Sequence, residues 1–390
     1  MKIGANWPMV RMTRRKGEIL YACEVCGFVY REMSWAEKCQ EYCTKHHACS
    51  LKITSHAIRR ERKRKAKALV LLSGGLDSML AMKLVANQGV EVEAVHFVTP
   101  FSKADERFAD RFCEEMGAKL HTVILGQEFL DMVANPRHGY GSQMNPCVDC
   151  RILQFRKAAE VAEKTGAHFL VTGEVLDERP FSQKKDQMLL IEKESGLAGK
   201  ILRPLSAKLL PETEPEKRRY VNQEHLLAVK GRRRLPQMEL ARKLGIDAYP
   251  NPSGGCLLTD PRFAERLREH MRHEEKLSIS DAELLKVGRH FRIDGTKVII
   301  GRNKEENEKL LAIAERNNLA PMEVVGYVGP VSLLVGKAGS EALKKAAAIT
   351  ARYSDAPKET SVQVRFRSME KEEVMEAKPL GRLELRHFSI

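Results

Sequence analysis

The hexapeptide Ser73-Gly74-Gly75-Leu76-Asp77-Ser78 joins the apolar run 68–72 to the helix-compatible stretch 79–86. A buried strand that ends in two glycines lets the backbone turn sharply, so that the amide N–H groups of the turn and of the following helix face an anion. The lysine of the Walker A pattern G-x-x-x-x-G-K-[ST] is missing here, which excludes that nucleotide-binding loop. The hexapeptide therefore predicts a phosphate-binding loop, with a plain glycine turn as the alternative.

Strand and helix signals alternate on the C-terminal side of this loop. Such alternation predicts an α/β fold with a doubly wound parallel sheet, which binds ligands at the carboxyl ends of its strands. The loop and Thr172-Gly173-Glu174 both follow predicted strands, so we expect them at one edge of the sheet. The predicted strands are 68–72, 92–98, 120–125 and 168–172, and the predicted helices are 79–87, 103–116 and 151–165.

At 390 residues the chain has room for two or three domains, and its net charge of +14 is unevenly spread. Residues 1–67 contain sixteen Lys or Arg and six Asp or Glu, which gives +10. A basic segment beside a phosphate-binding core favours RNA as the partner, with a solvated charge run as the alternative. We predict domains at 1–66, 67–268 and 275–390, the last an α+β module with strands at 361–367 and 381–388.

The nine cysteines are clustered, which argues for metal binding. Five lie in the first fifty residues, Cys147 and Cys150 form a C-x-x-C pair, and Cys256 follows a second Gly-Gly. We see no secretory signal and no apolar stretch of about 18 residues, so we expect a cytoplasmic protein without a membrane partner. In a reducing cytosol such thiols bind metals or do redox chemistry more often than they form structural disulfides.

The first four cysteines have the spacing C-x2-C-x12-C-x3-C, the register of a ββα zinc finger with thiolates in place of its histidines. On a helix, the second pair would lie one turn apart and point in one direction. We therefore expect a small four-cysteine metal-binding domain in which Zn²⁺ supplies most of the folding free energy, the alternative being reduced cysteines packed as small hydrophobes. The expected ligands are Cys23, Cys26, Cys39 and Cys43, with His46, His47 or Cys49 as substitutes.

The hexapeptide resembles the SGGxDS signature of the PP-loop ATP pyrophosphatases, which split ATP between its α and β phosphates and adenylate a second substrate. The resemblance implies that the hydroxyls of Ser73 and Ser78 hold pyrophosphate and that Asp77 lies near Mg²⁺ or the phosphates. The implied ATP-binding residues are Ser73, Gly74, Gly75, Leu76, Asp77, Ser78, Thr172 and Gly173.

Further motifs between residues 68 and 268 are similar to tRNA thiouridine synthases. Residues 145–155, 185–187 and 253–256 resemble the MnmA type, and residues 172–174 and 201–205 resemble the ThiI type. Cys147 stands where the MnmA pattern usually carries Asp, so that the chain has three candidate thiolates. Together with Cys150 and Cys256 it resembles the iron–sulfur thiolases related to TtuA, in which three thiolates hold a [4Fe–4S] cube and leave one iron open to hydrosulfide.

The resemblance implies a sulfurtransferase that adenylates a uracil carbonyl oxygen of tRNA, after which sulfur attacks the carbon and AMP leaves. Asp77, Cys147, Cys150 and Cys256 would be the catalytic residues. The sulfur would come as sulfide, or from a sulfur carrier or a cysteine desulfurase. In a second version of the sulfur transfer, Cys256 carries the sulfur as a persulfide, and Cys150 or Cys147 resolves the disulfide that forms. In a third, the pair at 147 and 150 binds zinc.

Residues 294–303, followed by a predicted helix at 305–317, look like the NFACT-type RNA-binding module, with a generic strand, turn and helix as the alternative. Two other functions stay open. One is a different PP-loop enzyme, such as an amidotransferase or a deazapurine synthase, with a zinc site and a small substrate. The other is a non-catalytic RNA-binding protein. The sequence decides neither between a monomer and a homodimer nor between 2-thio and 4-thio products.

Overall fold

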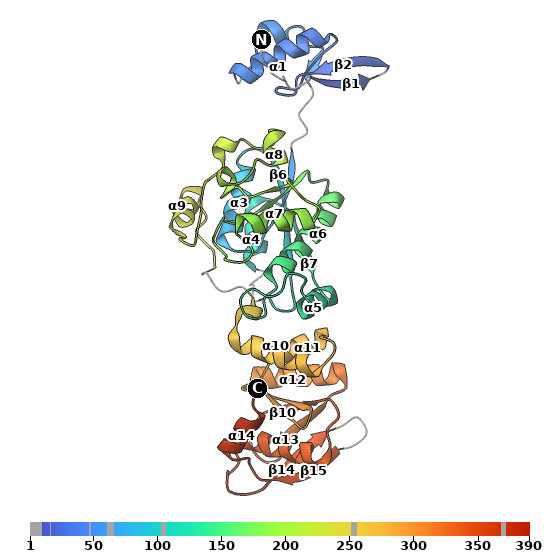
Figure 1. Ribbon diagram of the computed structural model, residues 1–390, viewed down its shortest axis with the longest axis vertical. Helices are drawn as coiled ribbons and strands as arrows, with labels where there is room; N and C mark the ends of the chain where they lie inside the picture. The colour runs from blue at the N-terminus through green and yellow to red at the C-terminus, as the bar shows by residue number, and fades with distance from the viewer. Residues whose placement is uncertain are drawn as a thin grey trace. The chain divides into compact units, whose positions relative to one another are not determined.

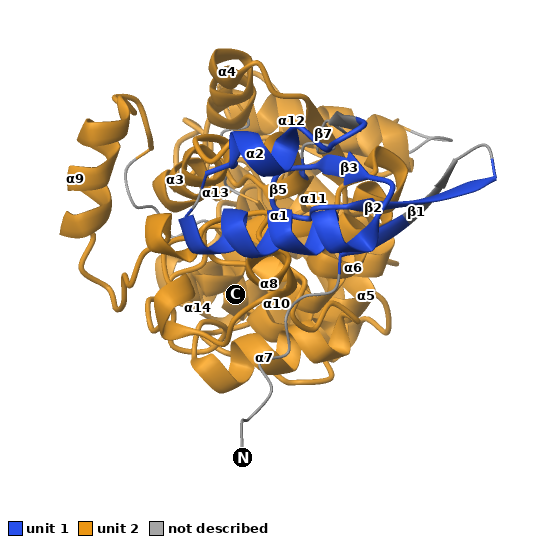
Figure 2. Cartoon of the chain, turned by 90° about the horizontal axis from the view of Figure 1, so that it is seen from above, with its two compact units in different colours: residues 1–66 blue, residues 67–390 orange. Residues whose placement is uncertain are grey.

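The computed structural model describes residues 10–15, 17–46, 48–60, 66–102, 107–250, 256–367 and 372–390. The chain divides into two compact units, residues 1–66 and residues 67–390 (Figure 2). Among the described residues, no helix combines the length and the apolar character that crossing a lipid bilayer requires.

The first unit is a small antiparallel sheet, of order β1-β2-β3-β4, with helix α1 following β3. Thiol side chains fill its core beside Val10, Tyr30 and Ala36, because so short a segment offers few large apolar residues. The elements are β1 Arg11–Arg15, β2 Glu18–Ala22, β3 Phe28–Tyr30, α1 Met33–His46, α2 Leu51–Thr54 and β4 Arg59–Arg60.

The middle of the chain forms a five-stranded parallel sheet of order β7-β6-β5-β8-β9 (Figure 1). Its central strand β5 is buried over residues 68–71, as expected for a strand covered on both faces. The predicted doubly wound α/β fold is confirmed. The strands are β5 Lys67–Leu71, β6 Glu91–Val98, β7 Leu120–Ile124, β8 Phe169–Thr172 and β9 Ile201–Leu202, and the helices are α3 Leu76–Ala86, α4 Arg107–Met116, α5 Gln127–Ala134, α6 Cys147–Thr165, α7 Lys185–Glu194, α8 Glu214–Lys217 and α9 Leu235–Leu244.

The C-terminal part is an antiparallel sheet of order β10-β11-β13-β12-β14-β15 with helices packed on it (Figure 1). Helix α10 connects this part to the parallel sheet, because its Phe263 shares a core with Phe101 while its Glu269 accepts a hydrogen bond from Arg292 at 2.6 Å. The elements are α10 Pro261–His273, α11 Ile279–Leu285, β10 Arg289–Ile293, β11 Thr296–Ile300, α12 Lys304–Asn317, β12 Ala320–Val324, β13 Ser332–Val335, α13 Ser340–Arg352, β14 Val362–Arg367, β15 Glu372–Ala377 and α14 Arg382–Phe388.

The strand predicted at 381–388 is wrong, because this stretch forms helix α14. The Glu384 carboxylate accepts a hydrogen bond from the Gly381 N–H at 3.3 Å, which starts the helix. Leu385 and Phe388, three residues apart, pack against the core, whereas Leu383 is 76% exposed. The apolar side chains therefore follow the helical period, although the letters also alternate.

The helix predicted at 151–165 begins four residues earlier, at Cys147. The Cys150 N–H donates to the Pro146 carbonyl at 2.9 Å, which closes the first turn. The C-x-x-C pair consequently lies on a helix and not in a preceding loop.

Candidate active site and metal centre

The phosphate-binding loop joins β5 to α3 at the carboxyl edge of the parallel sheet. Gly74 has a left-handed backbone with φ of 78°, which residues with a side chain rarely adopt. The Ser78 hydroxyl donates to the Gly75 carbonyl at 2.7 Å and lies 3.3 Å from the Ser73 hydroxyl. Helix α3 begins at Leu76, so its first N–H groups face the loop. This geometry suits a phosphate held by N–H groups and two hydroxyls.

Gly173 brings the neighbouring strand β8 against the loop. A Cβ atom at this position would lie 2.4 Å from the backbone carbon of Asp77 and from the backbone nitrogen of Ser78. Only glycine fits there, since real Cβ contacts are essentially never shorter than 3.0 Å. Thr172 is buried, and its hydroxyl donates to the Glu174 carboxylate at 3.2 Å. Of the two predicted residues at the end of β8, Gly173, just after the strand, therefore approaches the loop, and Thr172, its last residue, turns toward Glu174.

Asp77 lies among buried polar groups that the sequence did not reveal. Burial raises the pKa of Asp77, and the positive charges of Arg234 and Arg179 oppose that rise. Gln237 lies close enough to Asp77 to lower the pKa of its carboxyl group, although Oδ1 of Asp77, Nε of Arg234 and both polar side-chain atoms of Gln237 form no hydrogen bond of good geometry with a described residue. Glu178 belongs to the same group, since burial and the charge of Asp77 raise its pKa. Groups of this kind fit a site for a charged ligand such as ATP with Mg²⁺.

The structure brings Cys147, Cys150 and Cys256 into one region. The first turn of α6 lies at the carboxyl edge of the sheet, because this helix runs back before the parallel strand β8. The segment of Cys256 is fixed there by two backbone hydrogen bonds of 3.1 Å, one to the Phe101 carbonyl and one from the Met144 N–H. Cys150 and Cys256 pack against the same core, and burial followed by the charge of Cys256 raises the pKa of Cys150 to about 12.

The spacing of these three thiols differs from that of a site for one ion. Among the described residues, only the four N-terminal cysteines form a group whose ligand atoms all lie within 4.8 Å of one another. A single zinc ion needs such short separations, whereas each thiolate of an iron–sulfur cube binds a different iron. The three thiols are therefore spaced more widely than the four N-terminal ones. Residues 253–255 of the predicted S-G-G-C motif lie outside the described residues.

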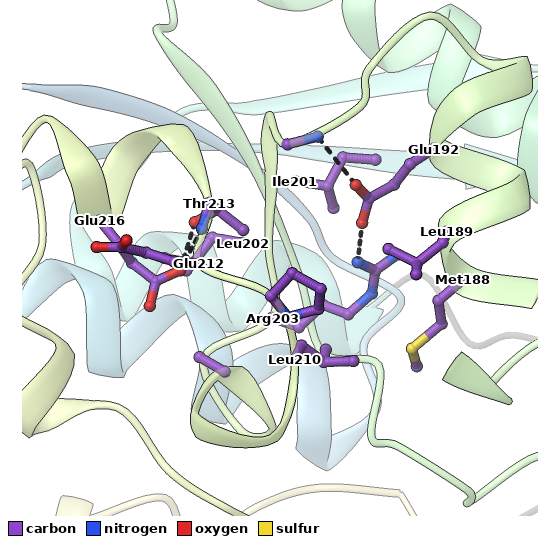
Figure 3. A pocket seen from close by; sticks show the side chains of 13 residues that line it. Met188, Leu189, Glu192, Ile201, Leu202, Arg203, Leu210, Glu212, Thr213 and Glu216 are labelled. Atoms are coloured by element: carbon purple, nitrogen blue, oxygen red, sulfur yellow. Dashed lines mark hydrogen bonds and ion pairs between the residues drawn. The ribbon is translucent and has the colours of Figure 1, made fainter. Parts of the chain in front are cut away.

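A buried ion-pair network connects the thiol helix to strand β8. Arg151, which follows Cys150, donates to Glu174 at 2.8 Å, and Arg203 donates to the same carboxylate at 2.9 Å. Arg203 also pairs with Glu192 (Figure 3). Although burial alone would raise it, the two guanidinium groups lower the pKa of Glu174 to about 2. Glu174 is therefore a fixed negative charge between α6 and the end of β8.

The four N-terminal cysteines form a compact group of ligands. The Sγ atoms of Cys26 and Cys39 are 3.4 Å apart, and those of Cys39 and Cys43 are 3.9 Å apart. Hydrogen bonds from Cys26 and Cys39 lower the pKa of Cys23 to about 3, whereas hydrogen bonding to Cys23 raises the pKa of Cys39. The helical placement predicted for Cys39 and Cys43 is confirmed, because both lie on α1. Such a group fits a tetrahedral Zn²⁺ site.

Of the three substitute ligands, Cys49 lies next to this group, whereas His46 packs on a ring and His47 lies beyond the described residues. Cys49 is 3.8 Å from Cys43, at the edge of the group. The ring of His46 packs on that of Tyr42, with centroids 4.4 Å apart. His47 lies outside the described residues.

Two family models match segments of the chain. Residues 64–208 match the model described as Thiamine biosynthesis protein (ThiI), and residues 288–389 match the NFACT protein RNA binding domain. The predicted PP-loop segment and the predicted NFACT-type module are thereby confirmed. The segment 1–63 lies outside both matches.

Relatives of the chain include tRNA-modifying proteins. The tRNA-specific 2-thiouridylase MnmA of Syntrophotalea carbinolica is 35% identical over 27% of this chain and 33% of its own length. MnmA of Pseudomonas fluorescens is 25% identical over 58% of this chain and 61% of its length. The tRNA sulfurtransferase of Desulfurococcus amylolyticus is 30% identical over 36% of this chain and 29% of its length. The chain thus spans about a third of the first of these relatives.

Two solved structures give partial matches. A 4-thiouridine synthetase in complex with RNA and ATP is 23% identical, with a TM-score of 0.31, over 46% of this chain and 52% of that chain. The U34-tRNA thiolase NcsA from Methanococcus maripaludis with its [4Fe-4S] cluster is 19% identical, with a TM-score of 0.29, over 53% of this chain and 74% of that chain.

Proposed function

We propose that this chain is an ATP-dependent transferase that replaces a uracil carbonyl oxygen of tRNA with sulfur. One observation carries the proposal: the phosphate-binding loop and the thiols of Cys147, Cys150 and Cys256 meet at the carboxyl edge of one parallel sheet. The ThiI match supports it, since residues 64–208 include the loop and the C-x-x-C pair. The relatives support it as well, because their names assign them to thiolation of tRNA.

In the first step ATP would bind with its β and γ phosphates in the loop. The hydroxyls of Ser73 and Ser78 and the N-terminal N–H groups of α3 would hold them, and Asp77 would hold Mg²⁺. The uracil oxygen attacks the α-phosphorus, the bond to the β-phosphate breaks, and pyrophosphate leaves. A donor aimed at such developing charge contributes about 10²–10³ in rate. Arg179 and Arg234 would neutralise phosphate charge from the side of Asp77.

In the second step sulfide attacks the adenylated carbon, and AMP leaves with the former uracil oxygen. A [4Fe–4S] cluster, when bound, supplies an open iron that presents sulfide as the nucleophile. The chain itself holds Cys147, Cys150 and Cys256 together, which the backbone bonds to Phe101 and Met144 support. In this version the donor is free sulfide or a sulfur carrier. In the alternative, a cysteine desulfurase or a sulfur carrier leaves a persulfide on Cys256, whose outer sulfur attacks the carbon as AMP leaves. Cys150 or Cys147 then attacks the Cys256 sulfur, which releases the thiolated uridine and leaves a disulfide that an external thiol reduces.

Each of the three parts of the chain would have its own role. Residues 1–66 would form a Zn²⁺-stabilised basic domain, residues 67–268 would perform adenylation and thiolation, and residues 275–390 would bind RNA. The match to an RNA-binding domain over residues 288–389 supports the last assignment. Cytoplasmic localisation, and a homodimer as one arrangement of the chain, belong to the same proposal.

Anaerobic reconstitution tests the function directly. The chain is loaded with iron and sulfide, incubated with tRNA, ATP and Mg²⁺, and the nucleosides are separated by mass spectrometry. We expect a brown protein that forms one thiolated uridine with equal amounts of AMP and pyrophosphate, and a Cys147→Ala variant without colour or product. A colourless protein that holds zinc at Cys147 and Cys150 and forms no thiolated nucleoside would refute the proposal in favour of a PP-loop enzyme with a small substrate.

A further inference from the structure

We propose that one exposed face of helix α1 is a second RNA-contact surface, which recognises unpaired bases by stacking. The inference rests on the proposed function, since the RNA is taken to be the tRNA substrate. It concerns a segment that neither family match covers, because the matches begin at residue 64 and residue 288. We call this surface the aromatic–basic face, and it consists of Trp35, Lys38, Tyr42, Lys45 and His46 on α1 with His56 beside them.

The aromatic and basic side chains of α1 lie on one side of the helix, and its buried side chains lie on another. With 3.6 residues per turn, positions three, four and seven apart share one face, as do 35, 38, 42, 45 and 46. The buried residues of α1 lie on the adjacent face, against the thiol core, and the partly buried Trp35 also packs against that core. Glu37 lies on the opposite flank, whereas Glu41, three residues from Lys38 and four from Lys45, borders the two lysines at the edge of the aromatic–basic face. The buried residues are Ala36, Cys39, Gln40 and Cys43.

Two ring pairs give this face its flat surfaces. The Trp35 and His56 rings stack with centroids 3.7 Å apart and planes 12° apart, and the Lys38 ammonium lies 4.7 Å from the Trp35 centroid. The second pair, Tyr42 with His46, has centroids 4.4 Å apart, and Tyr42 is 36% exposed. Rings already packed against a neighbour lose little freedom when a base stacks on them. At about 1.5 Å per residue, Trp35 and Tyr42 are about 10 Å apart along the helix, roughly the length of three stacked nucleotides.

The charge of the surroundings favours a polyanion as the occupant. Neither Lys38 nor Lys45 forms an ion pair with a described residue of the first unit. Residues 1–67 carry +10 in total, so the segment as a whole attracts a phosphate backbone. Rings interleaved with ammonium groups are the pattern of proteins that bind single-stranded nucleic acid.

The test compares binding of the full-length chain to a short unstructured RNA and to the same RNA in a duplex, by fluorescence anisotropy at several salt concentrations. Trp35→Ala and Tyr42→Ala should each weaken binding of the single strand about tenfold, whereas Trp35→Phe should keep most of the affinity. Lys38→Ala should lower the slope of log K against log salt by about 0.7. Glu37→Ala, exposed on the same helix, is the matched control and should not weaken binding. Zinc content shows that each variant keeps its fold.

Three outcomes separate the inference from the proposed function. Unchanged single-strand affinity in Trp35→Ala and Tyr42→Ala overturns the inference, and continued formation of thiolated uridine leaves the proposed function standing. Equal losses for single strand and duplex overturn recognition by stacking. Intact Trp35-dependent binding without any thiolated product overturns the proposed function but supports the surface.

Discussion

Replacing Gly173 by alanine should remove most of the turnover while the sheet stays folded. The new Cβ atom would lie 2.4 Å from backbone atoms of Asp77 and Ser78, about 1 Å closer than the 3.4 Å at which ordinary contact begins. Backbone atoms cannot rotate away, so the first turn of α3 must move by that distance. A misplacement of about 1 Å costs about 10²-fold in rate. Overpacking costs about 1–3 kcal/mol, or a few degrees in Tm.

The assay is the single-turnover rate of thiolated uridine formation, with thermal unfolding measured in parallel. Gly339→Ala is the matched control, because this glycine has an extended backbone and a Cβ atom added to it would meet no atom within 4 Å. We expect that variant to match the unchanged chain in rate, with at most a small fall in Tm because Gly339 is the N-cap residue of α13. A Gly173→Ala variant with an undiminished rate would refute the contact between β8 and the loop as a determinant of catalysis.

Three further predictions concern single side chains. Asp77→Ala should abolish pyrophosphate release and preserve tRNA affinity in filter binding, and a parallel loss of both would contradict its role at the phosphates. Cys150→Ser should lose most of the iron and labile sulfide after anaerobic reconstitution, whereas Cys113→Ser, buried on helix α4, should keep both. The pKa of Glu174 is about 2 in the folded chain against an ordinary value of 4.5, so its ion pairs contribute stability that is complete above pH 4.5 and is lost as the pH falls toward 2. Glu174→Gln should therefore lower the free energy of unfolding at neutral pH by about 3–5 kcal/mol and flatten its acid decline, and an unchanged urea midpoint at neutral pH would speak against the network.

The phosphate-binding loop and the cysteine group of the first unit could be predicted because both are local. The strand, the glycines and the helix around residues 73–78 follow one another directly, so their pattern fixes the turn. The spacing of the four cysteines likewise places Cys23 and Cys26 at a turn between strands and Cys39 and Cys43 one helical turn apart. The four Sγ atoms lie close together as expected. In both cases the residues concerned are close together in the sequence, so the prediction did not depend on how distant segments pack.

The neighbours of Asp77 could not be predicted, because they depend on packing between distant helices. Gln237 and Arg234 reach the loop only because α9 packs against α3. Arg234 ends a run of three arginines, which by itself indicates no more than a basic surface. Residues 381–388 show a second limit of prediction from sequence. Leu383 and Leu385 alternate with polar residues, as in a strand, but the segment is a helix, and the residues that pack against the core are Leu385 and Phe388.

The distance along the chain between Cys150 and Cys256 has a consequence for biosynthesis. The third thiol leaves the ribosome about a hundred residues after the second, a delay of roughly 5–20 seconds at ordinary rates of translation. During that interval the nascent polypeptide exposes only Cys147 and Cys150. Two thiolates can bind a zinc ion, whereas the proposed [4Fe–4S] cluster needs the third. If the three thiols hold the proposed cluster, its assembly has to wait until Cys256 has been synthesised, and overproduction under zinc-rich conditions should then raise the share of protein with zinc bound at Cys147 and Cys150.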